Sequence, residues 1–403
     1  TAPRRSHLVV HSSVTRSYSL RAAAQFYATV TTMQDLEAPL SGVVDTDKPR
    51  GWPRLQATIS IFGCTVAGGL VALPDAFQGV GLLAGCVLVV IGGVTTALSI
   101  HALAILSEHT NTSSYGGIAA AFFGPAFAAF VDFSVSLLLV GVISGSIIVL
   151  RDYFAELCPS DLCTTLSTAG TALVVLLPLS LPRRIGVMAY ASAISITAFA
   201  FIVGVLVVFG AGRLAAGTAR AGVWTKPATA LQLGECFRVI VYATACQMQV
   251  PAVFAGAKPP RDDAGAASAV ASVQAGSRRA PSAVARFVPV AAGAVTGMVV
   301  LFSLTAIFGV LAFGVPVKDN VLVTLKEQQP TMGGVAYLCL SAAVALACPL
   351  LVHPTRDGII SLVAELRARV GGRAHVQVDP PPLALHVGIT VGVIALSTTI
   401  ALT

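Results

Sequence analysis

Residues 57–82 read ATISIFGCTVAGGLVALPDAFQGVGL, and this stretch decides the fold. It is apolar throughout and long enough to cross a bilayer, which takes about 20 residues of helix. Its middle is Ala67-Gly68-Gly69, and Pro74 follows within two turns, so an unbroken helix is disfavoured there. Within a membrane, irregular backbone is tolerated only where it is buried in protein or lines a cavity. We therefore expect a membrane span that is interrupted near residue 67.

The composition places the whole chain in the membrane. Of its 403 residues, 55% are hydrophobic and only 11% are charged, whereas soluble domains carry about 25% charged residues. The net charge of +7 is spread over the loops and forms no basic stripe. We therefore expect a multi-pass all-α protein whose partner is the lipid bilayer and which binds no nucleic acid. The sequence does not indicate an oligomeric state.

Residues 55–403 are expected to form one transmembrane domain. The predicted spans are 57–82, 84–107, 126–150, 165–181, 186–210, 235–256, 287–313, 333–353 and 383–403. Because the last run reaches the end of the chain, we expect that this set of nine is C-terminally truncated.

Residues 1–54 are expected to be a disordered tail. Residues 1–32 are rich in Arg and Ser and contain no Asp or Glu, as in a transit peptide. The chain begins with Thr and its first methionine is Met33. We therefore favour the alternative that residues 1–32 are not native but translated from upstream of the true start, or that the chain is a fragment.

The loop charges predict the orientation of the spans. With a cytoplasmic N-terminus, most loop Lys and Arg residues face inside, as the positive-inside rule requires. Residues 357–371 are then expected to form a separate helix at the inner membrane surface, capped by Asp357. Cys158 and Cys163 share an outer loop and can form a disulfide if that side is oxidising. The other six cysteines are expected to be small buried hydrophobic residues.

Two stretches could carry chemistry. The amides freed at Ala67-Gly68-Gly69, with the positive end of the following half-helix, can bind a carboxylate; alternatively, these glycines only admit a neighbouring helix. Residues 235–251 carry many polar groups for a membrane span, which favours a cavity beside them. Asp75 is either a proton acceptor that faces the pathway or a structural residue at the outer mouth.

The sequence resembles the amino acid/auxin permease family, especially its sodium-coupled neutral amino acid transporters. Four stretches carry the resemblance, and they follow one another in the family's order and spacing. They are the glycine-rich break with its Leu-Pro-x-Ala-Phe (residues 68–77), a sixth-span motif (residues 241–247), a motif after span seven (residues 313–322) and a Pro-x-x-x-x-Pro-x-Arg at the end of span eight (residues 348–356).

The resemblance implies an inverted-repeat fold of the LeuT type, shared by the amino acid–polyamine–organocation transporters, with spans one and six broken around a midplane site. The implied substrate site holds an amino acid carboxylate and ammonium. Its residues are Ala67, Gly68, Gly69, Tyr242, Ala243, Thr244 and Gln247.

The chain departs from the family's sodium-dependent members at two positions. Gly63 stands where they tend to carry an asparagine, and Ala347 where they use a hydroxyl. Since both side-chain oxygens are missing, protons are favoured over sodium as the coupling ion, with Asp75 a third candidate coupling residue. No metal or other cofactor is expected.

We predict secondary active transport of neutral amino acids by alternating access, in a plasma membrane or a vacuolar or lysosomal membrane. The alternative is a non-transporting amino acid sensor or membrane interaction protein on the same fold. An enzyme is not expected, because no nucleophile has a plausible base nearby in the sequence.

Overall fold

The computed structural model describes residues 54–65, 69–158, 160–181, 188–218, 224–257, 282–314, 317–371 and 383–403. All of these belong to a unit of residues 49–403, which is distinct from a unit of residues 1–48. The predicted N-terminal tail, residues 1–54, therefore falls outside the described part except for Arg54.

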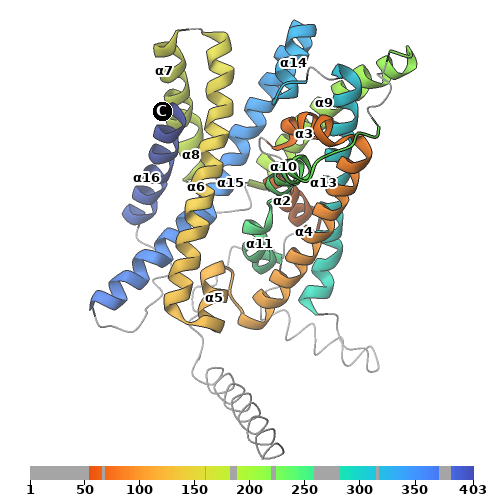
Figure 1. The fold of residues 1–403 in the computed structure, drawn as a ribbon. Helices are drawn as coiled ribbons and strands as arrows, with labels where there is room; N and C mark the ends of the chain where they lie inside the picture. The colour runs from red at the N-terminus through yellow and green to blue at the C-terminus, as the bar shows by residue number, and fades with distance from the viewer. Residues whose placement is uncertain are drawn as a thin grey trace, which may run out of the picture. The chain divides into compact units, whose positions relative to one another are not determined.

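Within these ranges the secondary structure is entirely helical (Figure 1). The helices are α2 (Arg54–Thr65), α3 (Gly69–Val80), α4 (Leu82–Thr110), α5 (Tyr115–Phe123), α6 (Pro125–Leu157), α7 (Asp161–Thr171), the π-helical turn η1 (Ala172–Leu176), α8 (Leu177–Ser180), α9 (Met188–Ala215), α10 (Ala230–Ala243), the 3₁₀ turn η3 (Gln247–Gln249), α11 (Val250–Ala257), α13 (Ala283–Phe313), α14 (Val321–Gln328), α15 (Pro330–Gly371) and α16 (Leu383–Leu402).

Eight of the described segments are long and apolar enough to cross a membrane, and the bent pair of α2 and α3 makes a ninth. Each of the nine predicted spans lies on one of them, so the prediction of an all-α polytopic fold is confirmed. Side chains on the outer surface are large and apolar, as lipid contact requires; Leu83, Val94 and Leu98 of α4 are examples.

Local sequence sets several helix ends. The hydroxyl of Thr229 accepts a hydrogen bond from the amide of Gln232, and the side-chain oxygen of Gln232 accepts one from the amide of Thr229, which forms a capping box that starts α10. Gly124 has a φ of 83°, which favours glycine, and the chain turns there from α5 into α6 at Pro125.

Helices from distant parts of the chain pack together in the interior. The pair α2 and α3 contacts α9, α10 and α13, while α15 contacts α6 and α9 over much of its length. A large core of buried apolar side chains joins these elements, including Phe77, Phe199, Phe254 and Phe302. A second core joins α6, α15 and α16, which lie together in Figure 1.

The structure corrects the prediction of a separate surface helix at residues 357–371. These residues continue α15, which runs unbroken from Pro330 to Gly371. Pro354 removes only one backbone donor from the helix, and no other Pro or Gly pair follows until Gly371-Gly372, so helix propagation continues. The short helices α5 and α14 were not predicted.

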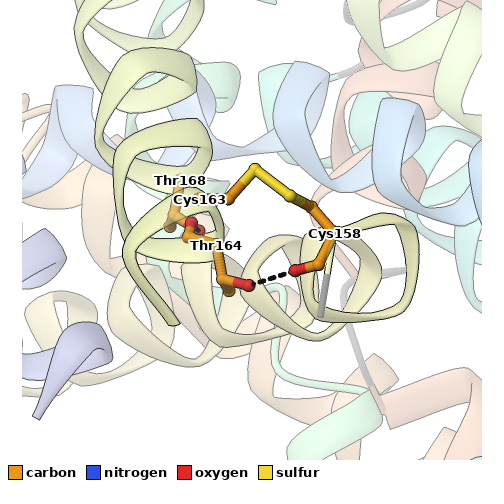
Figure 2. Close-up of a disulfide and its surroundings, with 4 residues drawn as sticks. All are labelled: Cys158, Cys163, Thr164 and Thr168. Carbon is orange, nitrogen blue, oxygen red and sulfur yellow. Dashed lines mark hydrogen bonds between the residues drawn. A yellow bond between two sulfur atoms is a disulfide. The ribbon is translucent and has the colours of Figure 1, made fainter. Parts of the chain in front are cut away.

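The disulfide between Cys158 and Cys163 is present (Figure 2). It joins the end of α6 to the first turn of α7, with a Cα–Cα distance of 6.1 Å. The hydroxyl of Thr164 donates to the Cys158 carbonyl over 3.0 Å, so the same connection is held by a second, non-covalent bond.

Candidate substrate site

Span one is broken where the sequence predicts it. α2 ends at Thr65 and α3 begins at Gly69, and their axes differ by 59°. The connecting residues 66–68 include the predicted site residues Ala67 and Gly68, and these lie outside the described residues. Gly69 is therefore the part of the predicted carboxylate site that the structure places: it is the first residue of α3.

Span six is also broken. α10 ends at Ala243, and α11 begins only at Val250, after the short η3 turn. At the end of α10 the amide of Thr244 donates to the Ile240 carbonyl over 2.9 Å, and the Thr244 hydroxyl donates to the same carbonyl over 3.0 Å. The proton of this hydroxyl is thereby committed to the backbone, and its oxygen can only accept a hydrogen bond from a ligand.

The two breaks touch each other. A Cβ placed on Gly69 would lie 2.8 Å from both the Cα and the Cβ of Ala243. Real Cβ atoms do not approach other atoms this closely, so only glycine permits the first residue of α3 to lie against the last residue of α10. This contact brings two of the predicted site residues, which are far apart in the sequence, to one point.

The half-helices pair crosswise. α3 packs against α10, and α2 packs against α11, as expected for two broken spans that run in opposite directions. At the contact, α3 presents its N-terminus, whose first amides carry partial positive charge, and α10 presents its C-terminus, whose last carbonyls carry partial negative charge. A zwitterion with one carboxylate and one ammonium matches this arrangement.

Tyr242 extends from the end of α10 toward α6. Its hydroxyl would lie 3.6 Å from a Cβ placed on Gly145 of α6, and its side chain remains 44% exposed. Tyr242 therefore lies between spans three and six without being sealed into the core.

Two residues absent from the predicted site hold the far side of the span-six break. The Tyr115 hydroxyl of α5 donates to the Gln247 carbonyl over 2.8 Å; burial raises the pKa of Tyr115, which keeps this donor protonated. The buried Gln249 side chain donates its amide to the Leu350 carbonyl of α15. Pro354 lacks the N–H that would occupy this carbonyl within the helix, so Gln249 replaces the missing donor.

A signal for one of these contacts is present in the sequence. Because Pro354 has no N–H, the sequence predicts that the carbonyl of Leu350, four residues earlier, lacks its helical donor. A glutamine within an apolar span needs a hydrogen-bond partner. Nothing in the sequence links Tyr115 to Gln247, because α5 is short and the two residues are far apart along the chain.

The predicted ion-coupling residues lie in different surroundings. Gly63 on α2 packs so closely against α9 that a Cβ would lie 2.6 Å from the Cβ of Ser192. Ala347 is buried on α15, a helix that contacts α2. Asp75 on α3 accepts a hydrogen bond of 2.8 Å from Gln78, which also donates to the Val317 carbonyl over 3.1 Å.

Comparison with known proteins identifies the family. The family model described as transmembrane amino acid transporter protein matches residues 53–403. The chain belongs to this family. Among solved structures, the crystal structure of MhsT in complex with L-phenylalanine is similar to this transporter family member, with a TM-score of 0.46 and 14% identity over 88% of this chain and 89% of that chain. No curated protein sequence matches the chain.

Membership agrees with the predicted resemblance to the amino acid/auxin permeases. It accounts for a polytopic membrane protein built for amino acid transport, and it places both helix breaks inside the matched residues.

Proposed function

We propose that this chain carries neutral amino acids across a membrane by alternating access. The observation that carries the proposal is the contact of Gly69 with Ala243, which sets the positive end of one half-helix beside the negative end of another. In a transporter, such interrupted helices form the substrate site near the bilayer midplane.

In the proposed complex, the substrate carboxylate is bound by the amides of Gly68 and Gly69 at the start of α3. The ammonium is bound by carbonyls of residues 242–244 at the end of α10. The substrate side chain faces spans three, six and eight, near Tyr242. The side chains that the structure places at the contact of the breaks are uncharged, which favours neutral substrates over acidic or basic ones.

We propose protons as the coupling ion. Sodium prefers hard oxygen ligands, and Gly63 and Ala347 supply no side-chain oxygen where the sodium-dependent members of the family carry one. The close packing of Gly63 on Ser192 leaves no room at that position for a larger side chain. Backbone carbonyls remain available to sodium, so the experiment must compare both ions.

The experiment is uptake into liposomes that contain the purified protein. Each of the twenty labelled amino acids is offered under an inward proton gradient, an inward sodium gradient or neither. We expect uptake of neutral amino acids that is accelerated by the proton gradient. Absence of uptake for all twenty would reject transport, and acceleration by sodium alone would reject proton coupling.

The second candidate is a non-transporting amino acid sensor on the same fold. The missing side-chain oxygens at Gly63 and Ala347 favour it, because loss of an ion site can leave substrate binding without a driving ion. Saturable binding of a labelled neutral amino acid, with no uptake into the same liposomes under any gradient, would support the sensor and reject the transporter.

A further inference from the structure

Asp132 is a buried acid within the membrane-spanning part of α6. Its side chain is 6% exposed, and it forms no salt bridge among the described residues. Acids in such positions are costly and are by default candidates for function. The substrate site proposed above does not use it.

The carboxylate of Asp132 lies against the first turn of α5. A Cβ placed on Gly116 would lie 2.1 Å from Asp132 Oδ2 and 2.4 Å from Asp132 Oδ1, so this carboxylate is in direct contact with Gly116. Because Gly116 is the second residue of α5, the carboxylate also faces the positive end of that helix. The positive end of α5 attracts the ionised form of Asp132, whereas burial of the side chain disfavours that form.

Among the described residues, the charged groups at this end of α15 contact other partners. Arg356 of α15 contacts the Ser180 carbonyl, His353 and His386 of α16, and Asp357 lies beside the Arg356 guanidinium. α15 instead contributes Gly358, where a Cβ would lie 2.7 Å from Ser136 Oγ. Ser136, one turn beyond Asp132, is buried, and its hydroxyl has no hydrogen-bond partner in the described part of the chain.

The residue next to Gly116 ties α5 to the substrate site. The Tyr115 hydroxyl donates to the Gln247 carbonyl in the span-six break over 2.8 Å. The first two residues of α5 therefore contact two different helical segments: Gly116 lies against α6, and Tyr115 is hydrogen-bonded to the broken span. α5 also lies at the end of the bundle that the loop charges predict to face the cytoplasm.

We propose that α5 is an inner latch, closed by the ionised carboxylate of Asp132 on Gly116 and by Tyr115 on Gln247, and released when Asp132 is protonated. A proton from the inner aqueous phase converts the carboxylate to a carboxylic acid, and its departure restores the charge. The attraction between the carboxylate charge and the positive end of α5 is then lost. With α5 released, the Gln247 carbonyl loses its donor and the inner half of span six is free to move.

The chain contains its own reporter for this motion. Cys246, adjacent to Gln247, is 1% exposed, and Cys236 on α10 is equally buried. Cys246 lies in the break of span six, beside the carbonyl that Tyr115 binds. Cys236 lies in α10, the half of span six that precedes the break. Alkylation of each by a maleimide in the full-length purified protein, followed by peptide mass spectrometry, measures the opening at both places at once.

We expect Asp132→Asn to raise the alkylation rate of Cys246 at neutral pH by about fivefold, the scale of the interaction between one charge and a helix end. Tyr115→Phe should raise it similarly, and the double variant should exceed the larger single effect by little, because both variants open one latch. As the pH falls and wild-type Asp132 becomes protonated, the ratio of Asp132→Asn to wild type should approach one.

The rate at Cys236 is the control and should not change. An unchanged Cys246 rate in either single variant, multiplicative effects in the double variant, or equal increases at Cys236 and Cys246 would each overturn the latch. The latch proposal rests on the proposed function in one respect: it assigns the opening of the latch to the transport cycle. Alkylation requires no flux, so failure of the latch and failure of transport are separate results.

Discussion

At the residue scale, the contact between Gly69 and Ala243 leaves no room for a side chain at position 69. A methyl group on Gly69 would meet backbone and side-chain atoms of Ala243 at 2.8 Å. We expect Gly69→Ala to cost about 1–3 kcal/mol of stability through overpacking and to abolish amino acid binding. Gly79→Ala is the matched control on the same helix, since a Cβ there meets nothing within 4 Å. Equal behaviour of the two variants in thermal unfolding and ligand binding would refute this role of Gly69.

A second residue-scale prediction concerns Gln249. Truncation to alanine leaves the Leu350 carbonyl buried without its donor, which should cost about 1–3 kcal/mol. In a Pro354→Ala background the helix can supply its own N–H to Leu350, so the cost of Gln249→Ala should fall. Thermal unfolding of the four proteins in this cycle measures the coupling, and strictly additive losses would show that the amide does not replace the proline's missing donor.

Individual contacts follow from the sequence only where a backbone rule applies. The glycine pair marks the break of span one, because glycine is costly inside a helix. The partner of Gly69 was not predictable in this way, since Ala243 carries no chemical signal and its position depends on how the spans pack. The hydrogen bond from Tyr115 to the Gln247 carbonyl is not predictable either, because it also depends on how the helices pack.

At the element scale, the disulfide fixes the turn from α6 into α7. Replacing Cys158 and Cys163 with serine should cost about 2 kcal/mol, because the closed loop is short and its entropy contribution is correspondingly limited. Cys339→Ser, at a half-buried free cysteine, is the control for the substitution itself. Thermal unfolding without reductant tests this, and no loss relative to that control would contradict a stabilising bond.

Elements were predicted well where hydrophobic length decides them. All nine spans were placed, because about 20 consecutive apolar residues have few other uses. Short helices such as α5 and α14 contain too few residues for a clear hydrophobic pattern. The sequence does not predict the length of α15, because Asp357 is a residue typical of a helix N-cap, whereas in the structure the helix continues through it.

At the scale of the whole molecule, the orientation remains a prediction from the loop charges. A reductant that cannot cross membranes, added outside intact cells, should reduce the Cys158–Cys163 bond, whereas a tag placed before residue 49 should be reached by antibody only after permeabilisation. The positive-inside rule requires both results. A tag that antibody reaches without permeabilisation, together with a disulfide that is reduced only after it, would invert the proposed topology.

The central claim is that two opposed helix ends bind the two charges of an amino acid. Competition against a labelled neutral amino acid bound to the purified protein tests it most directly, with the substrate's methyl ester and its decarboxylated amine as competitors. We predict that either loss of charge weakens competition at least about 100-fold, as expected when a buried charged partner is left unpaired, while a change of one methylene in the substrate side chain has a much smaller effect. Competition by the ester or the amine as strong as that of the amino acid itself would contradict the claim.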